Sequence, residues 1–236
     1  MSSCEKPVEK GEFGNPLIKF YGDALADVGS SIAISDNGFV ICGSITLMDR
    51  ITNESGGREI VLGSEHKDMG VIITDKKGVQ QNIINIGSPG VEDIGRKVIS
   101  YNGSFYCLGT ATVEHAGIPD RDVVVARIDG QGQLLDTWFI GDQYNQFAFD
   151  IIPNNTNSGF IICGASASGI SGELDLKVWE VSMDGTVGET YLRGFEGVDD
   201  KAIRIINDHN GGYIVAGSTY ELPGSVLGNN YQYNTD

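Results

Sequence analysis

The stretch Gly211–Tyr220, GGYIVAGSTY, decides the fold of this chain. It joins a Gly-Gly turn to a short apolar run that suits a buried strand, and it continues into Gly-Ser-Thr. Three other stretches share the apolar run and its closing glycine: Gly38–Ser44 (GFVICGS), Ser104–Thr110 (SFYCLGT) and Gly159–Ala165 (GFIICGA). Because recurrence along a chain fixes an architecture, these copies predict a protein built from repeated units.

Each copy lies inside a longer unit that predicts four strands. An alternating strand and a polar turn precede the glycine-closed strand, and a third strand follows it and ends in an Asp-plus-Gly turn. A lead-in strand that ends in glycine then begins the next unit. The closing glycines of these lead-in strands are Gly22, Gly87, Gly141 and Gly194. Helical periodicity is missing throughout, so the chain is predicted to be all-β.

Four antiparallel strands in each unit of roughly fifty to sixty-five residues are typical of β-propeller blades. Residues 16–236 therefore predict about three complete blades and a partial one. The glycine-closed second strand resembles that of kelch-like propellers, and GGYIVAGST resembles repeats of exported bacterial propeller lipoproteins. The resemblance spans Leu17–Tyr220, and it implies a propeller fold. Because propellers usually close with four to eight blades, we expect a longer ring whose last blade Leu17–Gly22 completes.

The resemblance implies no catalytic mechanism. Kelch blades close the second strand with Gly-Gly, whereas this chain has Gly-Ser, Gly-Thr or Gly-Ala at that position. It also has neither a Trp-Asp blade signature nor the Ser-x-Asp-x-Gly-x-Thr-Trp box of sialidase-type propellers. The three histidines, His66, His115 and His209, lie in or beside predicted loops without ligand spacing, so we expect solvated side chains and assign no catalytic residue and no metal ligand.

The charge of the chain argues against nucleic acid as a partner. Its 236 residues include 32 Asp and Glu against 16 Lys and Arg, which gives a formal net charge of −16. Nucleic-acid affinity depends on lysines and arginines that displace counterions from phosphates. No apolar run reaches the roughly eighteen residues that a membrane helix needs. We therefore expect contact with a membrane only through an anchor.

Cys4 is the predicted anchor. Two small residues precede it and a polar, charged stretch follows, as at the lipidation site of bacterial lipoproteins. Residues 1–15 would then form a tether, and the protein would be exported and lipid-anchored at the cell envelope or cell surface. The other interpretation is a chance cysteine near a disordered end.

The other three cysteines lie in the glycine-closed strands. Cys42 and Cys163 occupy the same position, just before the closing glycine, so we expect small buried apolar side chains there. Cys107 falls one residue earlier and should point to the other side of its strand. Equivalent positions in neighbouring units lie apart, so no disulfide is expected between them.

Two sets of loops are predicted to share one face of the propeller. The first set contains Asp27, Asp93 and Asp200 at one recurring position, where the remaining unit has Gln146. A ring of these carboxylates could hold a calcium ion or meet a basic partner. Since Gln146 breaks the ring, the favoured interpretation is that the aspartate accepts backbone N–H bonds and caps a turn.

The second set contains the long loop Thr46–Lys67, about twice the length of the matching loops Ala111–Arg121 and Ser166–Leu176. It contains Asp49, Arg50, Arg58 and Glu59, and long loops on a rigid scaffold often bind partners. It could equally be a neutral insertion. The sequence therefore favours a non-enzymatic scaffold for a protein or glycan, with two alternatives: part of a carbohydrate-active enzyme whose catalytic residues are not identifiable, or a structural segment of a surface assembly.

Overall fold

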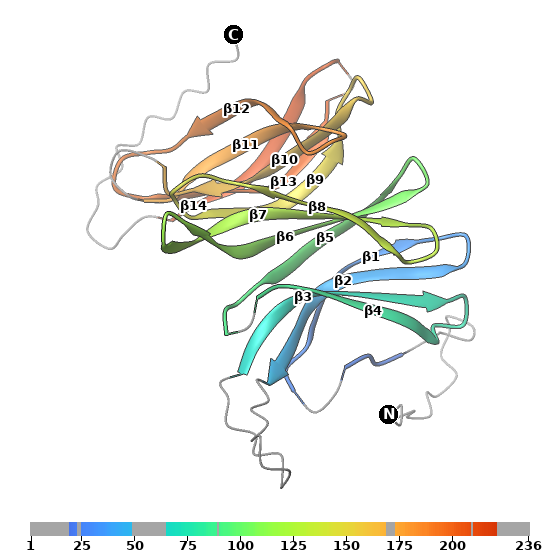
Figure 1. Ribbon diagram of the computed structural model, residues 1–236. Coiled ribbons are helices and arrows are strands. Elements are labelled where there is room, and N and C mark those ends of the chain that lie inside the picture. Colours follow the sequence, from blue (N-terminus) through green and yellow to red (C-terminus); the bar gives the residue numbers. More distant parts are fainter. Residues whose placement is uncertain are drawn as a thin grey trace, which may run out of the picture.

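The computed structural model describes residues 19–22, 25–48, 65–88, 90–168, 173–208 and 210–220. This part of the chain is all-β, as predicted, with fourteen strands in three four-stranded sheets and one two-stranded sheet (Figure 1). Within it, no helix long and apolar enough to span a membrane is found.

All strand pairs are antiparallel, and neighbours in a sheet are neighbours in the chain. The strands are β1 (Val28–Ile34), β2 (Gly38–Met48), β3 (Glu65–Asp75), β4 (Gln80–Ile86), β5 (Ile94–Tyr101), β6 (Ser104–His115), β7 (Ile118–Asp129), β8 (Leu134–Ile140), β9 (Gln146–Pro153), β10 (Gly159–Ser166), β11 (Asp175–Ser182), β12 (Val187–Arg193), β13 (Asp199–Asn207) and β14 (Tyr213–Tyr220). The lead-in strand before each later unit is thus the fourth strand of the preceding sheet.

Two sequence-based expectations about strands are wrong. The described part of Leu17–Gly22, residues 19–22, forms no strand, and the Tyr21 hydroxyl donates a hydrogen bond to the Gly78 carbonyl (2.8 Å). The loop expected over Ala111–Arg121 is mostly strand, because β6 and β7 continue into a long hairpin. Ala116 (φ 53°) and Gly117 (φ 84°) form its two-residue turn, in which positive φ at both residues matches the strand twist.

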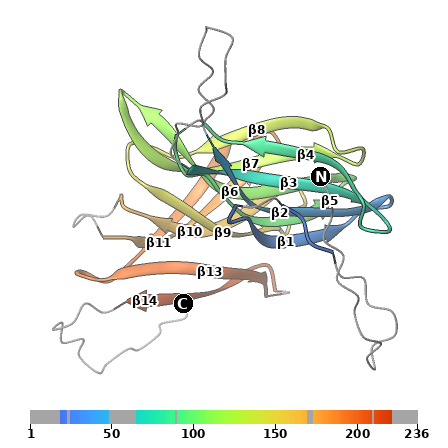
Figure 2. The ribbon, with the colours of Figure 1, turned by 90° about the horizontal axis from the view of Figure 1, so that it is seen from below.

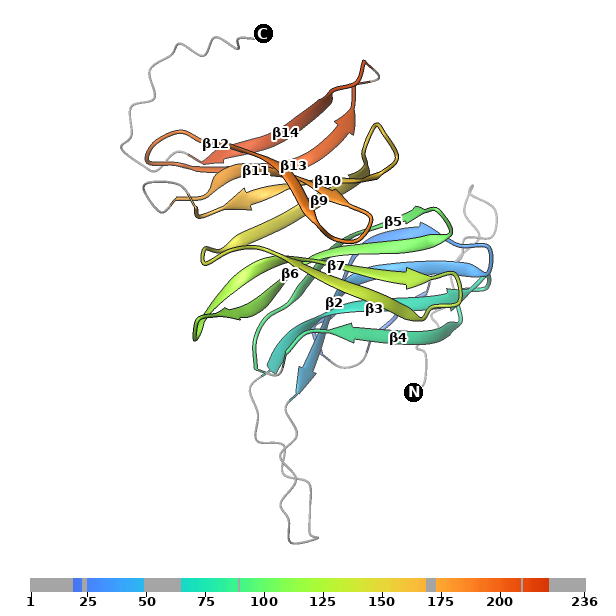
Figure 3. The same ribbon diagram turned by 45° about the horizontal axis from the view of Figure 1, so that its top comes forward.

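The sheets stack face to face in chain order (Figures 1 and 3). Three hydrophobic cores fill the interfaces, and the middle one contains the aromatic side chains of Tyr106, Trp138, Phe160 and Trp179. The first strands of successive sheets contact one another: β1 with β5, β5 with β9, and β9 with β13. Figure 2 shows the β13–β14 hairpin as the outermost layer, next to β10 and β11.

The glycine that closes each second strand faces a backbone carbonyl of the first strand. At Gly109, an added Cβ would lie 2.5 Å from the Ile94 carbonyl oxygen and 2.7 Å from Met69 Sδ. The pairing of β5 with β6 shifts register between Gly95 and Lys97, which is a β-bulge. The same shift and the same kind of approach occur at Gly43, Gly164 and Gly217. The bulge therefore explains why only glycine fits this position.

The three strand cysteines are fully buried free thiols, as expected. Cys42 and Cys107 lie in the core between the first two sheets, and Cys163 lies in the core between the last two. Cys107 does face the opposite side of its sheet. That orientation places its thiol within hydrogen-bonding reach of Cys42, which the offset of Cys107 from the equivalent position allows. Both remain free thiols, so no disulfide joins them.

Candidate functional site

The candidate functional site lies where the connections between sheets meet the hairpin turns at one end of the stack. We call this end the loop face and define it by residues 25–27, 87–88, 90–93, 115–118, 141–145 and 194–198. Several residues named from the sequence lie outside the described part of the chain: Cys4, Asp49, Arg50, Arg58, Glu59 and His209.

The recurring aspartates of the loop face bind backbone groups. Asp93 is 1% exposed, and its carboxylate accepts bonds from the N–H groups of Thr112 (2.6 Å) and Ser88 (3.0 Å). Asp200 is 5% exposed and accepts from the Phe195 N–H (2.7 Å). These are the bonds expected of an aspartate that caps a turn by accepting backbone N–H groups. Burial raises the pKa of the Asp93 carboxyl, and the two N–H donors only partly offset this effect.

Asp27 makes a bond of the same kind, since its Oδ1 accepts from the Thr46 N–H (2.9 Å). The lead-in glycines make room for these carboxylates. A Cβ on Gly87 would lie 2.5 Å from both Asp68 Oδ1 and Asp93 Oδ2. Two carboxylates therefore converge on this turn, and the absence of a side chain at Gly87 is a steric requirement.

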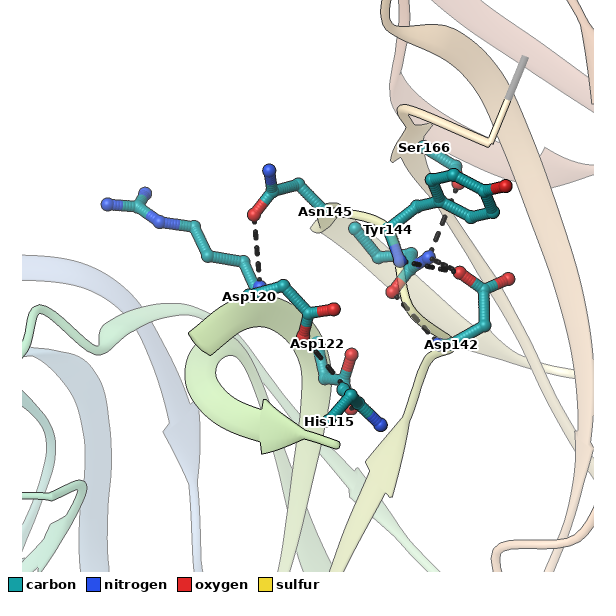
Figure 4. Close-up of polar contacts among 9 residues, drawn as sticks. His115, Asp120, Asp122, Asp142, Tyr144, Asn145 and Ser166 are labelled. Atoms are coloured by element: carbon teal, nitrogen blue, oxygen red, sulfur yellow. Dashed lines mark hydrogen bonds and ion pairs between the residues drawn. The ribbon is translucent and has the colours of Figure 1, made fainter. Parts of the chain in front are cut away.

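A cluster of one histidine and two aspartates lies on the β6–β7 hairpin (Figure 4). His115 Nε2 is 3.0 Å from Asp122 Oδ2 and 3.5 Å from Asp120 Oδ1. One ligand-type atom from each residue lies within 4.8 Å of the other two. We call His115, Asp120 and Asp122 the hairpin triad.

Strand register brings the triad together. Asp120 pairs with Val113 and Asp122 pairs with Ala111, while His115 pairs with Ile118 next to the turn. Alternate residues of a strand share one side, and directly paired residues share it too. The sequence Asp-x-Asp on β7 therefore places both carboxylates on the side where His115 projects from β6.

Burial makes the triad electrostatically unusual. Asp120 is 7% exposed and Asp122 is 2% exposed, whereas the His115 side chain is 34% exposed. Both oxygens of Asp120 and Oδ1 of Asp122 are buried without a hydrogen-bond donor. Burial raises the pKa of Asp122, although His115 opposes this effect, and the hydrogen bond with Asp122 raises the pKa of His115.

The residues beside the triad are mainly paired with one another. Gln146 Nε2 donates to Asp142 Oδ1 (2.6 Å), and Lys177 Nζ lies 3.7 Å from Asp142 Oδ2. A Cβ on Gly141 would contact both Asp122 Oδ1 and Gln146 Oε1, so the amide lies next to the triad. An aspartate at position 146 would add a third carboxylate there, which gives a reason for the neutral side chain at this one position.

The triad was not expected from the sequence, and the expectation that the histidines are solvated is wrong for His66. That residue is 7% exposed inside β3, and its Nε2 lies 3.7 Å from Asp68 Oδ1. His115 is half-buried and bonded. The available signal was Asp120-x-Asp122 followed by an apolar strand, together with Ala116-Gly117 as a hairpin turn.

A scan against protein-family models finds no match for the chain, and a search of curated protein sequences finds none either.

Proposed function

We propose that this protein is a non-enzymatic binding scaffold whose sheets are blades of a kelch-like β-propeller. The proposal is supported by the four-stranded antiparallel sheets in chain order and by the contacts between their first strands. In a propeller the blades surround a central channel. The contacts of β1 with β5, β5 with β9, and β9 with β13 suit strands beside such a channel.

The observation that carries the binding role is a set of exposed apolar side chains on the loop face. Ile118, Tyr144 and Phe195 are exposed, and they come from three different connections. The exposed carboxylates of Glu92 and Asp142 lie on neighbouring connections. Apolar side chains among polar ones, on turns held by a rigid framework, are typical of surfaces that bind partners. We propose a protein or a glycan as the partner, because the net charge of −16 disfavours nucleic acid.

Array screening of the full chain against glycans and envelope proteins tests the proposal. We expect Ile118→Ser combined with Tyr144→Ser to abolish binding of any array ligand. The matched control is Val79→Ser combined with Val187→Ser, which removes two exposed apolar side chains near the opposite end of the sheets. Equal loss in both double variants, or no loss in the first, would place the binding surface elsewhere.

We further propose that Cys4 is lipidated and that the protein is exported and held at the cell envelope by this anchor. The proposal rests on the sequence around Cys4. Intact-mass measurement of protein extracted from host membranes should show a lipid increment. A Cys4→Ser variant should lack the increment and appear in the soluble fraction. Membrane recovery of that variant at the wild-type level would refute the anchor.

A carbohydrate-active enzyme is the second candidate, and the observation that favours it is the carboxyl pair of Asp120 and Asp122. Burial raises the pKa of Asp122, and glycoside hydrolysis uses one carboxylic acid beside one carboxylate. Screening with glycoside substrates distinguishes the candidates. Hydrolysis that Asp122→Asn abolishes, with the fold intact by circular dichroism, would replace the scaffold proposal.

A further inference from the structure

We propose that the hairpin triad, His115, Asp120 and Asp122, binds a divalent transition-metal ion, with Zn²⁺ as the best match. The site adjoins the proposed binding surface, since His115 pairs with Ile118, but it uses different side chains and requires no partner. Three features of the described residues support it: the donor set, the spacing of the donors, and the buried carboxylate oxygens without donors.

The donor set suits zinc. Zn²⁺ takes imidazole nitrogen and carboxylate oxygen as ligands, with bonds of about 2.0–2.2 Å. In a tetrahedral site with such bonds, neighbouring ligand atoms lie about 3.3–3.5 Å apart. His115 Nε2 lies 3.0 Å from Asp122 Oδ2 and 3.5 Å from Asp120 Oδ1. The carboxylate oxygens of Asp120 and Asp122 lie within 4.8 Å of each other, so rotation of these side chains would let all three donors surround one ion.

The negative charge of the two buried carboxylates is an independent reason to expect a cation at the triad. Two nearly buried carboxylates face one imidazole, and in the described part of the chain no lysine or arginine lies within ion-pair distance of either. Arg121, between them in sequence, instead approaches Glu92 and the ring of Phe147. Burying an unpaired carboxylate costs free energy, and a divalent ion would balance two of them beside a neutral imidazole.

The buried oxygens without donors favour a cation as their partner. Both oxygens of Asp120 and Oδ1 of Asp122 are buried and accept no hydrogen bond. Figure 4 shows the two carboxylates and the imidazole converging near the turn of the hairpin. The partly exposed His115 side chain lies between this cluster and solvent, so an ion could enter from the loop face. Three protein ligands would leave a fourth position for water.

Calorimetric titration of chelator-treated full chain with Zn²⁺ tests the proposal. We expect one Zn²⁺ per chain at the triad, with at least tenfold weaker binding in His115→Gln and in Asp120→Asn. His66→Gln is the matched control, because His66 lies 3.7 Å from Asp68 but belongs to no group of three donors at ligand spacing among the described residues, and it should retain wild-type affinity. Co²⁺ should bind with visible absorption that His115→Gln removes, and Ca²⁺ should not compete.

The melting temperature provides a second test, which remains informative if the affinity for Zn²⁺ is too low for calorimetry. Zn²⁺ should raise the melting temperature of the wild type and leave that of Asp120→Asn unchanged. Without metal, Asp120→Asn should melt no lower than the wild type, because the substitution removes a buried charge. The proposal is overturned if the wild type binds no Zn²⁺, if the triad variants and His66→Gln bind it equally, or if Ca²⁺ displaces it.

Discussion

Lys97 Nζ lies 3.3 Å from Asp150 Oδ1 and links β5 of the second sheet to β9 of the third. The other oxygen of Asp150 accepts a hydrogen bond from the Ile205 N–H on β13 (3.2 Å). The Asp150 side chain is nearly buried. One carboxylate therefore contacts the first strands of three successive sheets.

This arrangement predicts that Lys97→Met destabilises the fold. The substitution leaves the buried carboxylate without its cation, and we expect a loss of about 1–3 kcal/mol in the free energy of unfolding, since Lys97 is partly exposed to solvent. Urea unfolding measures it. The double variant Lys97→Met/Asp150→Asn should recover part of the loss, because the amide is uncharged. A change below about 0.5 kcal/mol in the single variant would show that water solvates Asp150 adequately.

The bulge at the closing glycine predicts a second effect. Gly109→Ala places a Cβ against the Ile94 carbonyl and Met69 Sδ, and the backbone cannot move without breaking the pairing of β5 with β6. We expect a loss of about 1–3 kcal/mol by thermal or urea unfolding. Gly130→Ala is the control, because the nearest atom to its added Cβ is 3.8 Å away. Equal stability of the two variants would contradict the steric explanation.

Asp93 predicts a dependence on pH. Burial raises the pKa of its carboxyl, so the folded chain binds this proton more readily than the unfolded chain. The contribution of Asp93 to the free energy of unfolding therefore increases as the pH falls through the folded pKa, and it becomes constant below the unfolded pKa. Asp93→Asn cannot take up the proton.

We expect Asp93→Asn to be about 1–2 kcal/mol less stable at pH about 7, because its NH₂ group faces a backbone N–H. The difference from the wild type should widen as the pH falls towards about 4. Urea unfolding at a series of pH values measures both effects. A difference that stays constant with pH would mean that the ionisation of Asp93 is the same in the folded and unfolded chains.

The buried thiols predict slow alkylation. Burial raises the pKa of Cys163 to about 12, and the hydrogen bond with Cys42 together with burial raises the pKa of Cys107. In a Cys4→Ser variant, iodoacetamide at pH about 8 should modify none of the three remaining cysteines while the chain is folded. In denaturant it should modify all three, as mass spectrometry would show. Rapid modification of the folded chain would indicate that its sheets separate readily.

Much of the fold could be predicted because its signals are local. The apolar runs and the glycines that close them lie within a few residues of each other, so the strands and their grouping in fours follow from the sequence. Gly43 and Gly109 were recognisable as recurring positions, but their steric role depends on a bulge in another strand. The long hairpin was missed, because Glu114, Pro119 and Asp120 are typical of loops.

The triad could not be predicted for a related reason. It depends on which residue of β6 faces which residue of β7, and a shift of one residue would turn the carboxylates to the other side of the sheet. Asp120 and His115 were expected in the loop Ala111–Arg121, which has no defined side, and Asp122 just before the strand that follows it. Likewise, recurring Asp93 predicted a turn, whereas its deep burial depends on the contact with Thr112 of β6.

The unequal cores between the sheets have a consequence for how the molecule opens. Among the residues that the structure describes, the middle core contains twelve buried residues, including large aromatic ones, whereas the core under the β13–β14 hairpin contains four. Stability in a stack of sheets is approximately a sum of nearest-neighbour terms, so the weakest interface is expected to separate first. The β13–β14 hairpin should therefore unfold before the other sheets. Amide hydrogen exchange should be fastest in this hairpin and slowest in β6 and β10.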